Sequence, residues 1–254
     1  MKQGLALQGC SIVITRPAHQ ASSICWQLRQ AGAKVLPFPL LAITEPDNIL
    51  HTQAQLANLA QYHYVIFTSP NAVDCALQQL NGVLPSKVLV AAVGQKTAQC
   101  LAKWGVSVSV VPETLFNSEA LLATSELRCV KGQSIAIIRG EGGRTLLGDT
   151  LQQRGAQVDY ISVYRRVCPV NDIEPLLQDN NQIDWVVLTS VESLKNWLRL
   201  TNGHPALDKV ALLLGSERIL QVAKQLGYVG VLQCSEDPSD ESVYARLLSL
   251  LENK

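Results

Sequence analysis

Six short segments of this sequence place hydroxyl, lysine or arginine side chains directly after apolar runs. They are residues 15–17, 68–71, 94–97, 139–144, 189–192 and 215–218. If each apolar run is a strand and each segment opens the next helix, every segment presents unpaired backbone N–H groups at the positive end of a helix dipole. Such helix ends bind anions, so six of them together predict a site for several carboxylates.

The segments supply candidate binding residues, and each has a structural alternative. Ser69 before Pro70 fits an ordinary helix N-cap, and Thr189 with Glu192 fits a capping box. The arginines have acidic residues of the chain as alternative partners. The candidates for substrate binding are Arg16, Ser69, Asn71, Lys96, Thr97, Arg139, Gly140, Arg144, Ser190, Ser216 and Arg218.

Tyr164 is a candidate for acid catalysis. It follows apolar Val163 and precedes Arg165 and Arg166. A phenol beside guanidinium groups can donate a proton to a leaving oxygen. The alternative is a tyrosine of an amphipathic linker, with its ring packed and its hydroxyl in water. The residues alone leave both interpretations open.

Cofactor and metal motifs do not occur. The glycines at 140, 142 and 143 do not form GxGxxG, and GxxxxGK[ST] is found nowhere in the chain. These absences argue against a dinucleotide or a nucleoside triphosphate. The seven cysteines and four histidines show no ligand spacing. We therefore expect no cofactor and no metal.

The composition excludes several classes of protein. Hydrophobic residues make up 47% of the 254, which excludes an intrinsically disordered chain. Basic and acidic residues number 21 each and aromatic residues are 5%, so no nucleic-acid partner is expected. No apolar run reaches the roughly 18 residues that span a bilayer, and the first residues lack the features of a signal peptide. We expect a cytoplasmic protein without membrane association.

Apolar runs alternate with helix-period segments from end to end, which predicts α/β architecture with parallel sheets. The runs are rich in Val and Ile, as strands buried on both faces are. Expected helices include 20–30, 71–80, 95–104, 146–154, 217–226 and 241–251. Expected strands are 11–15, 35–38, 64–68, 88–93, 106–111, 134–138, 158–164, 185–189, 210–214 and 229–233.

The chain also contains an internal repeat. Residues 9–16 match 132–139, and 28–35 match 151–158, both at an offset of 123. Residues 64–69 match 185–190, and 87–94 match 209–215, at nearly the same offset. Such collinear matches predict two similar doubly wound domains with an active-site cleft between them. Two equivalent extended segments, near 37–42 and 162–168, are expected to pair as a two-stranded linker.

The motifs resemble those of the uroporphyrinogen-III synthase family over nearly the whole chain. The most specific part is the run IIRGEGGRTLLGDTLQQRGAQV at 137–158 followed by VYRR at 163–166. The resemblance implies crossed connectivity between the domains. The first domain would comprise residues 1–36 plus 169–254, and the second residues 37–168. The other motifs are ITRP at 14–17, VIFTSPNAV at 65–73, AAVGQKTA at 91–98, NSEALL at 117–122 and LTS at 188–190.

The resemblance also implies a reaction. Such enzymes are cofactor-independent lyases of haem and sirohaem biosynthesis. They convert the linear tetrapyrrole hydroxymethylbilane to uroporphyrinogen III, with loss of water and inversion of ring D through an azafulvene and a spiro intermediate. The substrate carries eight carboxylates, which a set of local N–H donors can bind without a basic surface. By motif, Tyr164 matches the family's proposed acid, and Ser69, Thr97 and Ser190 match its cleft hydroxyls.

One loop departs from the family pattern, and other functions stay open. Many members have Gly-x-Thr-Thr where this chain has Gly215-Ser216-Glu217-Arg218, so Ser216 is the only hydroxyl donor of these four residues, and Arg218 is an alternative donor to a propionate. A two-domain anion-binding module without catalysis is the main alternative. A nucleotide-dependent enzyme is disfavoured by the missing phosphate loops. We expect a monomer, and contact with the preceding hydroxymethylbilane synthase stays open.

Overall fold

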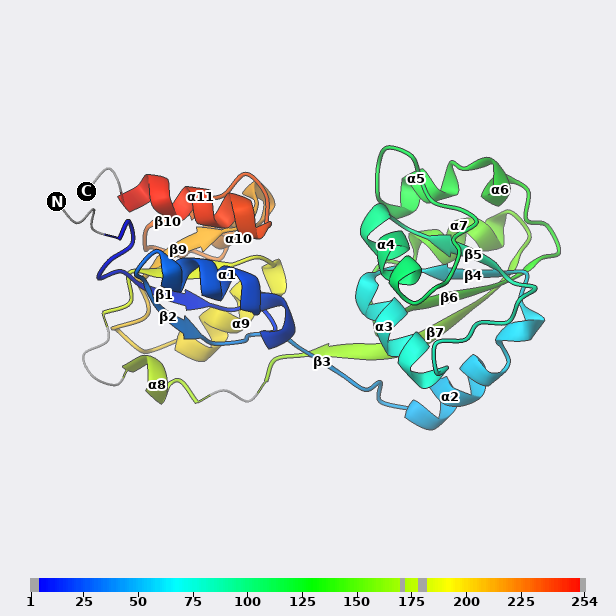
Figure 1. The fold of residues 1–254 in the computed structure, drawn as a ribbon, viewed down its shortest axis with the longest axis horizontal. Coiled ribbons are helices and arrows are strands. Elements are labelled where there is room, and N and C mark those ends of the chain that lie inside the picture. The colour runs from blue at the N-terminus through cyan, green and yellow to red at the C-terminus, as the bar shows by residue number, and fades with distance from the viewer. Residues whose placement is uncertain (1–4, 170–171, 178–181, 252–254) are drawn as a thin grey trace. The chain divides into compact units, whose positions relative to one another are not determined.

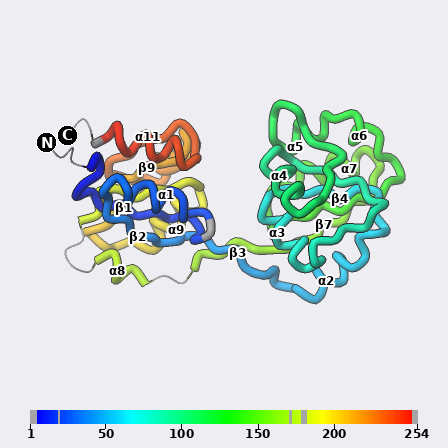
Figure 2. Tube along the Cα trace, viewed as in Figure 1, coloured from blue at the N-terminus to red at the C-terminus, as the bar shows by residue number. Residues whose placement is uncertain are grey.

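The structure is a computed structural model that describes residues 5–169, 172–177 and 182–251. The chain forms two compact units. Unit 1 comprises Met1–Ala42 with Val167–Lys254, and unit 2 comprises Ile43–Arg166. The chain therefore passes between the units twice. Unit 1 contains both the N-terminal part of the chain, drawn in blue, and the C-terminal part, drawn in yellow-green to red (Figure 2).

Each unit contains one five-stranded sheet. The order is β10-β9-β8-β1-β2 in unit 1 and β3-β7-β6-β4-β5 in unit 2. The β1–β2, β1–β8, β8–β9 and β9–β10 pairs are parallel, as are β6–β7, β4–β6 and β4–β5. The strands are β1 Ser11–Ile14, β2 Lys34–Pro37, β3 Ala42–Thr44, β4 Tyr64–Phe67, β5 Leu89–Ala92, β6 Ser134–Gly140, β7 Gln157–Val167, β8 Trp185–Leu188, β9 Ala211–Leu214 and β10 Leu232–Cys234.

Helices cover both faces of each sheet, because successive buried residues of a strand point to opposite faces. A short 3₁₀ helix, Leu59–Gln61, follows α2. The α-helices are α1 Ala18–Gln30, α2 Ile49–Ala57, α3 Pro70–Gln79, α4 Gln95–Lys103, α5 Ser118–Leu122, α6 Ser125–Arg128, α7 Leu146–Gln153, α8 Glu174–Leu177, α9 Val191–Thr201, α10 Glu217–Gln225 and α11 Asp240–Leu251.

In unit 1 the strand β1, which lies between β8 and β2, contributes to two separate cores. Ile12 and Ile14 pack with α1 and α11 on one face of the sheet. Val13 packs with α9 and α10 on the other face, where Trp197 is fully buried. Figure 1 shows α1 and α11 together and α9 on the other side of β1 and β2. Unit 1 is thus a three-layer α/β/α unit.

Unit 2 has the same three layers. Val65 and Phe67 of β4 pack with α2, α3 and α4. Tyr64 and Ile66 of the same strand face α5, α6 and α7. In Figure 1, α3 lies on one side of β4 and β6, and α5 and α6 lie on the other. The α/β class with parallel sheets is therefore confirmed.

The strand order reflects the repeat. By the sequence offset, β1 and β2 correspond to β6 and β7, and β8 and β9 correspond to β4 and β5. Both sheets contain these four strands in the same spatial order. Each unit thus combines the opening half of one repeat copy with the closing half of the other. In addition, β3 pairs with β7, where the sequence predicted pairing between two extended segments.

Three details differ from the sequence predictions. Residues 106–111 form no named strand and join β5 through a bridge between Ala91 and Val110, because the backbone hydrogen bonds to β5 involve only Ser109 and Val110 of this segment. The N-cap of α9 is Ser190 and not Thr189. Unit 1 extends to Ala42 instead of residue 36 because Phe38 and Leu40 are buried in its core. At the other crossing, unit 1 begins again at Val167 instead of 169.

Candidate functional site

A β-bulge in unit 2 sets the position of Tyr164. Along the β6–β7 pair Arg139 lies opposite Ser162, but the next residue, Gly140, lies opposite Tyr164. Val163 is therefore the extra residue, and both it and Tyr164 are buried. Bulges re-aim side chains and are frequent beside active sites. Tyr164 thus lies in the sheet of unit 2 rather than in a linker, and only 1% of it is exposed.

The Tyr164 hydroxyl has two side-chain partners. Its oxygen lies 3.2 Å from the hydroxyl oxygen of Ser69, and Nη2 of Arg166 donates to it at 3.2 Å. The Arg166 guanidinium carbon lies 5.7 Å from the centre of the Tyr164 ring. Arg165, the other predicted neighbour, instead pairs with Asp47 and donates to Thr44. One of the two predicted guanidinium groups therefore reaches the phenol.

Ser69 has a structural role as well as a contact with the phenol. It is the N-cap of α3, and its oxygen accepts from the Ala72 N–H at 3.1 Å, with Pro70 at the start of the helix. The N-cap alternative is therefore confirmed. It coexists with the hydrogen bond to Tyr164, because a hydroxyl oxygen has two lone pairs and one proton.

Close approach of the Tyr164 ring to the backbone explains the glycine at position 140. A Cβ built on Gly140 would lie 2.6 Å from Cε2 and Cζ of the Tyr164 ring. Any larger residue would displace the ring. The neighbouring N–H of Glu141 donates to the Tyr164 carbonyl at 2.8 Å. Tyr164 is therefore held in place both by the packing of its ring on Gly140 and by the hydrogen bond to its backbone carbonyl.

These groups line a cavity of about 210 Å³, which we call the tyrosine pocket. It lies at the carboxyl ends of β4 and β6, the edge where ligands bind in doubly wound sheets. Its walls include Thr68, Ser69, Arg139, Gly140, Arg144, Tyr164 and Arg166. Arg144 is exposed and pairs with Glu119, and this hydrogen bond lowers the pKa of the Glu119 carboxyl.

A second cavity of about 510 Å³, the lysine pocket, adjoins the start of α4. Lys96, Thr97 and Phe116 line it, and Thr68 lines both it and the tyrosine pocket. Thr97 is buried, whereas Lys96 is exposed. Asn71 is half-buried in the first turn of α3, outside the residues that line these two pockets.

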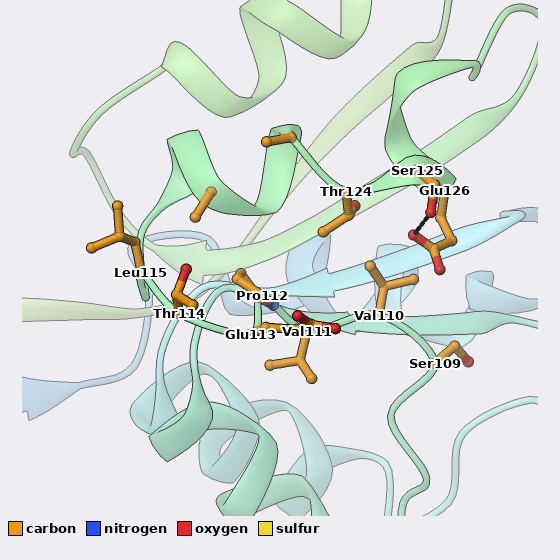
Figure 3. A pocket seen from close by; sticks show the side chains of 12 residues that line it. Ser109, Val110, Val111, Pro112, Glu113, Thr114, Leu115, Thr124, Ser125 and Glu126 are labelled. Carbon is orange, nitrogen blue, oxygen red and sulfur yellow. Dashed lines mark hydrogen bonds between the residues drawn. The ribbon is translucent and has the colours of Figure 1, made fainter.

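Another concavity of about 540 Å³ lies between residues 109–115 and the α5–α6 region (Figure 3). Its polar groups include Ser125, which donates to the Glu126 carboxylate at 3.0 Å. None of the predicted binding residues lines it. It is therefore separate from the site predicted by the sequence.

In unit 1 the predicted residues follow three adjacent parallel strands. Arg16 follows β1, Ser190 follows β8, and Ser216 and Arg218 follow β9. Arg16 pairs with Asp240 and donates to the Pro238 carbonyl, so both of these partners belong to unit 1. Ser190 caps α9, where its oxygen accepts from the Ser193 N–H at 2.9 Å. Ser216 is half-buried at the N-cap of α10, and Arg218 is exposed.

Two residues of the tyrosine pocket were not singled out from the sequence. Arg166 was noted only with Arg165, and Tyr160 was not distinguished from the other tyrosines. The Arg139 guanidinium lies 4.9 Å from the Tyr160 ring centre. The contact between Tyr160 and Arg139 depends on the register of β6 against β7 and on the bulge that follows Ser162. Neither feature can be predicted from residue spacing alone.

Comparison with known proteins identifies the family. The model for uroporphyrinogen-III synthase HemD matches residues 23–245. The uroporphyrinogen-III synthase of Escherichia coli (strain K12) is 31% identical over 226 residues, which span 86% of this chain and 92% of that protein. The chain belongs to the uroporphyrinogen-III synthase family. A further member, from Synechococcus elongatus, is 32% identical over 216 residues, or 82% of this chain and 81% of that protein.

Solved structures of the family share the fold. A mutant uroporphyrinogen III synthase from Thermus thermophilus has a TM-score of 0.65 at 17% identity and covers 97% of this chain and 100% of its own. The Helicobacter pylori enzyme has a TM-score of 0.63 at 16% identity, with coverage of 95% and 99%. The predicted family and two-domain α/β fold are confirmed.

Within 5–169, 172–177 and 182–251, His, Cys, Asp and Glu side chains form no group of three or more suited to a metal ion. In the same ranges, no helix has both the length and the apolar character needed to cross a bilayer.

Proposed function

We propose that this chain, as a uroporphyrinogen-III synthase, converts hydroxymethylbilane to uroporphyrinogen III as a cofactor-independent hydro-lyase, with Tyr164 as the acid. Family membership supports the reaction. The observation that carries the acid assignment is the Tyr164 hydroxyl, hydrogen-bonded to Ser69 and Arg166 in a pocket at the carboxyl edge of the sheet.

The first step is loss of the substrate hydroxyl. Tyr164 donates its proton to that oxygen, the carbon–oxygen bond breaks with its electron pair going to oxygen, and water leaves, so that the pyrrole ring becomes a cationic, protonated azafulvene that keeps its N–H. The phenolate oxygen then accepts from Arg166 and from Ser69, whose own oxygen already accepts from the Ala72 N–H. These donors stabilise the charge that develops on the phenol. The phenolate regains its proton when a later step releases one.

The later steps require positioning of the rings. Ring D attacks through its substituted carbon, and the spiro intermediate fragments and recloses to the type III isomer. Fixed carboxylate contacts hold the substrate in the geometry that this closure needs. We propose that these contacts come from helix N-termini and side chains of both units. The residues are Arg16, Ser69, Asn71, Lys96, Thr97, Gly140, Arg144, Ser190, Ser216 and Arg218.

A Tyr164→Phe variant tests the acid assignment. General acid catalysis contributes about 10²- to 10⁴-fold, so we expect kcat to fall at least 100-fold. KM should stay within about twofold, because the phenol ring and the carboxylate contacts remain. The assay incubates each protein with hydroxymethylbilane, oxidises the product and separates the type I and type III isomers. An unchanged kcat would remove Tyr164 as the acid.

The same assay tests the alternative of an anion-binding module. Formation of only the type I isomer by the unaltered chain, together with tight binding of uroporphyrinogen III, would replace the synthase proposal with that alternative. A monomeric state, a cytoplasmic location and any contact with hydroxymethylbilane synthase stay predictions from the sequence.

A further inference from the structure

Arg139 directs its donors into its own loop. Its Nε donates to the Gly140 carbonyl at 3.2 Å and its Nη1 to the Arg144 carbonyl at 3.1 Å. Its Nη2 donates to the Gly142 carbonyl. Residues 140–144, which we call the glycine loop, thus wrap around one guanidinium group. Three of the five N–H donors of this guanidinium are therefore used on carbonyl oxygens of the chain rather than on a carboxylate.

The glycine loop is shaped to fit that guanidinium. Gly142 and Gly143 have φ of +70° and +90°, in the left-handed region that favours glycine. A Cβ built on Gly143 would lie 2.6 Å from Nη2 of Arg139. A side chain at this position would therefore have to push the guanidinium away from the Gly142 carbonyl.

Tyr160 fixes the other side of the guanidinium. Its ring centre lies 4.9 Å from the guanidinium carbon, within the range of a cation–π contact. Its hydroxyl donates to the Thr145 carbonyl at 3.1 Å, at the start of α7. A Cβ on Gly148 of α7 would lie only 2.0 Å from that hydroxyl oxygen. Tyr160 therefore joins the guanidinium, the end of the glycine loop and α7.

The glycine loop in turn contacts Tyr164. Gly140 packs so closely on the Tyr164 ring that a Cβ would collide with it, and the Glu141 N–H donates to the Tyr164 carbonyl. A shift of the glycine loop would therefore move the phenol relative to Ser69 and Arg166. A misplacement of about 1 Å can cost about 100-fold in rate.

We propose that Arg139 is a positioning residue: with Tyr160 it holds the glycine loop against Tyr164, and it does not bind a substrate carboxylate. This revises the binding role predicted for Arg139 from the sequence. The inference rests on the proposed acid role of Tyr164, and it names the group that keeps the acid in place.

The test uses Arg139→Lys and Arg139→Gln in the full chain. A positioning role needs the planar fork, so both variants should lower kcat about tenfold or more and leave KM within twofold. Amide hydrogen exchange of residues 141–145 should become faster in both. If Arg139→Lys keeps the original kcat while Arg139→Gln raises KM tenfold with unchanged exchange, Arg139 binds a carboxylate and the proposal is wrong.

Two controls separate the effect from general loss of an arginine or of stability. Arg128→Gln removes an exposed arginine that donates to the Ala123 carbonyl, and it should leave kcat and exchange at 141–145 unchanged. Tyr160→Phe removes only the hydrogen bond to Thr145, whereas Tyr160→Leu also removes the ring. We expect the Leu variant to lower kcat more than the Phe variant, and equal kcat values in these two variants would contradict the role given to the ring.

The Tyr164→Phe background distinguishes failure of this inference from failure of the acid assignment. If Arg139 acts through Tyr164, Arg139→Gln should lower kcat much less in that background than in the unaltered chain. A full tenfold loss there would overturn the inference. An unchanged kcat in Tyr164→Phe itself would instead overturn the acid assignment, while faster exchange in Arg139→Gln would still support its hold on the glycine loop.

Discussion

The two units share a scaffold but use equivalent residues differently. Arg16 in unit 1 and Arg139 in unit 2 occupy the same position of the repeat, at the end of the first strand of each copy. Arg16 pairs with Asp240 at the start of α11, whereas Arg139 binds the carbonyls of its own loop. The position equivalent to Gly140 is Pro17, which leads directly into α1. Unit 2 has a glycine loop where unit 1 has an immediate helix.

The equivalent serines show the same contrast. Ser69 and Ser190 are both N-caps, and their capping partners are Ala72 and Ser193 at matching positions. The Ser190 oxygen lies 2.7 Å from the Ser193 hydroxyl, while the Ser69 oxygen lies 3.2 Å from the Tyr164 phenol. The shared fold places a hydroxyl at each strand end, and local substitutions decide whether it meets an acid.

Among variants that test this difference between the units, Gly140→Ala is expected to have the largest effect on kcat. The added methyl would lie 2.6 Å from the Tyr164 ring, so the ring or the strand must move. We expect kcat to fall about 100-fold and the free energy of unfolding to fall by about 1–3 kcal/mol. Steady-state kinetics and urea unfolding measure the two quantities.

Gly132→Ala is the matched control for that variant. Gly132 has a positive φ, but nothing lies within 4 Å of a Cβ built on it. Its substitution should reduce stability by about 1 kcal/mol through backbone strain and leave kcat unchanged. If the two variants have the same kcat, close packing of Gly140 on Tyr164 does not matter for the reaction.

Ser69→Ala and Ser190→Ala should have smaller effects, equal on stability but different on kcat. Both remove an N-cap, so both should lower stability by about 1 kcal/mol. Ser69→Ala should also lower kcat about tenfold, because a hydrogen bond to a charged group contributes about 1.5 kcal/mol. Ser190→Ala should raise KM with little change in kcat. A similar loss of kcat in both variants would show that the units do not differ in this way.

The smallest effect is expected in the stability of the fold at alkaline pH, to which Tyr62 of unit 2 and Tyr228 of unit 1 contribute. Burial raises the pKa of Tyr62 and of Tyr228 from about 10 to about 12, and a hydrogen bond to Asp159 adds to the shift of the Tyr62 pKa. A raised pKa means that the folded state favours the neutral phenol. The resulting stability is complete below pH 10 and is lost as the pH rises to 12.

Unfolding by urea across that range measures this loss. Tyr62→Phe and Tyr228→Phe should each make the decline between pH 10 and 12 shallower, and Asp159→Asn should act in unit 2 only. A decline that is identical in all four proteins would mean that these tyrosines do not control it.

Strand positions were predictable because buried parallel strands are continuous apolar runs. The predicted 64–68, 134–138 and 185–189 agree with β4, β6 and β8 to within two residues at each end. The repeat matched the strands that occupy equivalent places in the two sheets. The prediction of a strand at 106–111 was wrong, because alternating valines also occur in an edge segment that forms a single bridge.

The residues around Tyr164 were partly predictable. The motifs placed Ser69, Gly140 and Tyr164 at strand ends, and the structure brings these three together. The inward turn of Arg139 and the pairing of Arg165 with Asp47 were not predictable. They depend on the bulge at Val163 and on loop hydrogen bonds, which residue spacing does not encode.

The most direct test of the acid role compares two leaving groups. Tyr164→Phe and the unaltered chain would each be given hydroxymethylbilane and a bilane with a carboxylate ester in place of the hydroxyl, and formation of the type III isomer would be timed. An ester leaves without a proton from the protein. We predict a rate deficit of at least 100-fold with the hydroxyl substrate and a much smaller one with the ester. An equal deficit with both substrates would contradict the account.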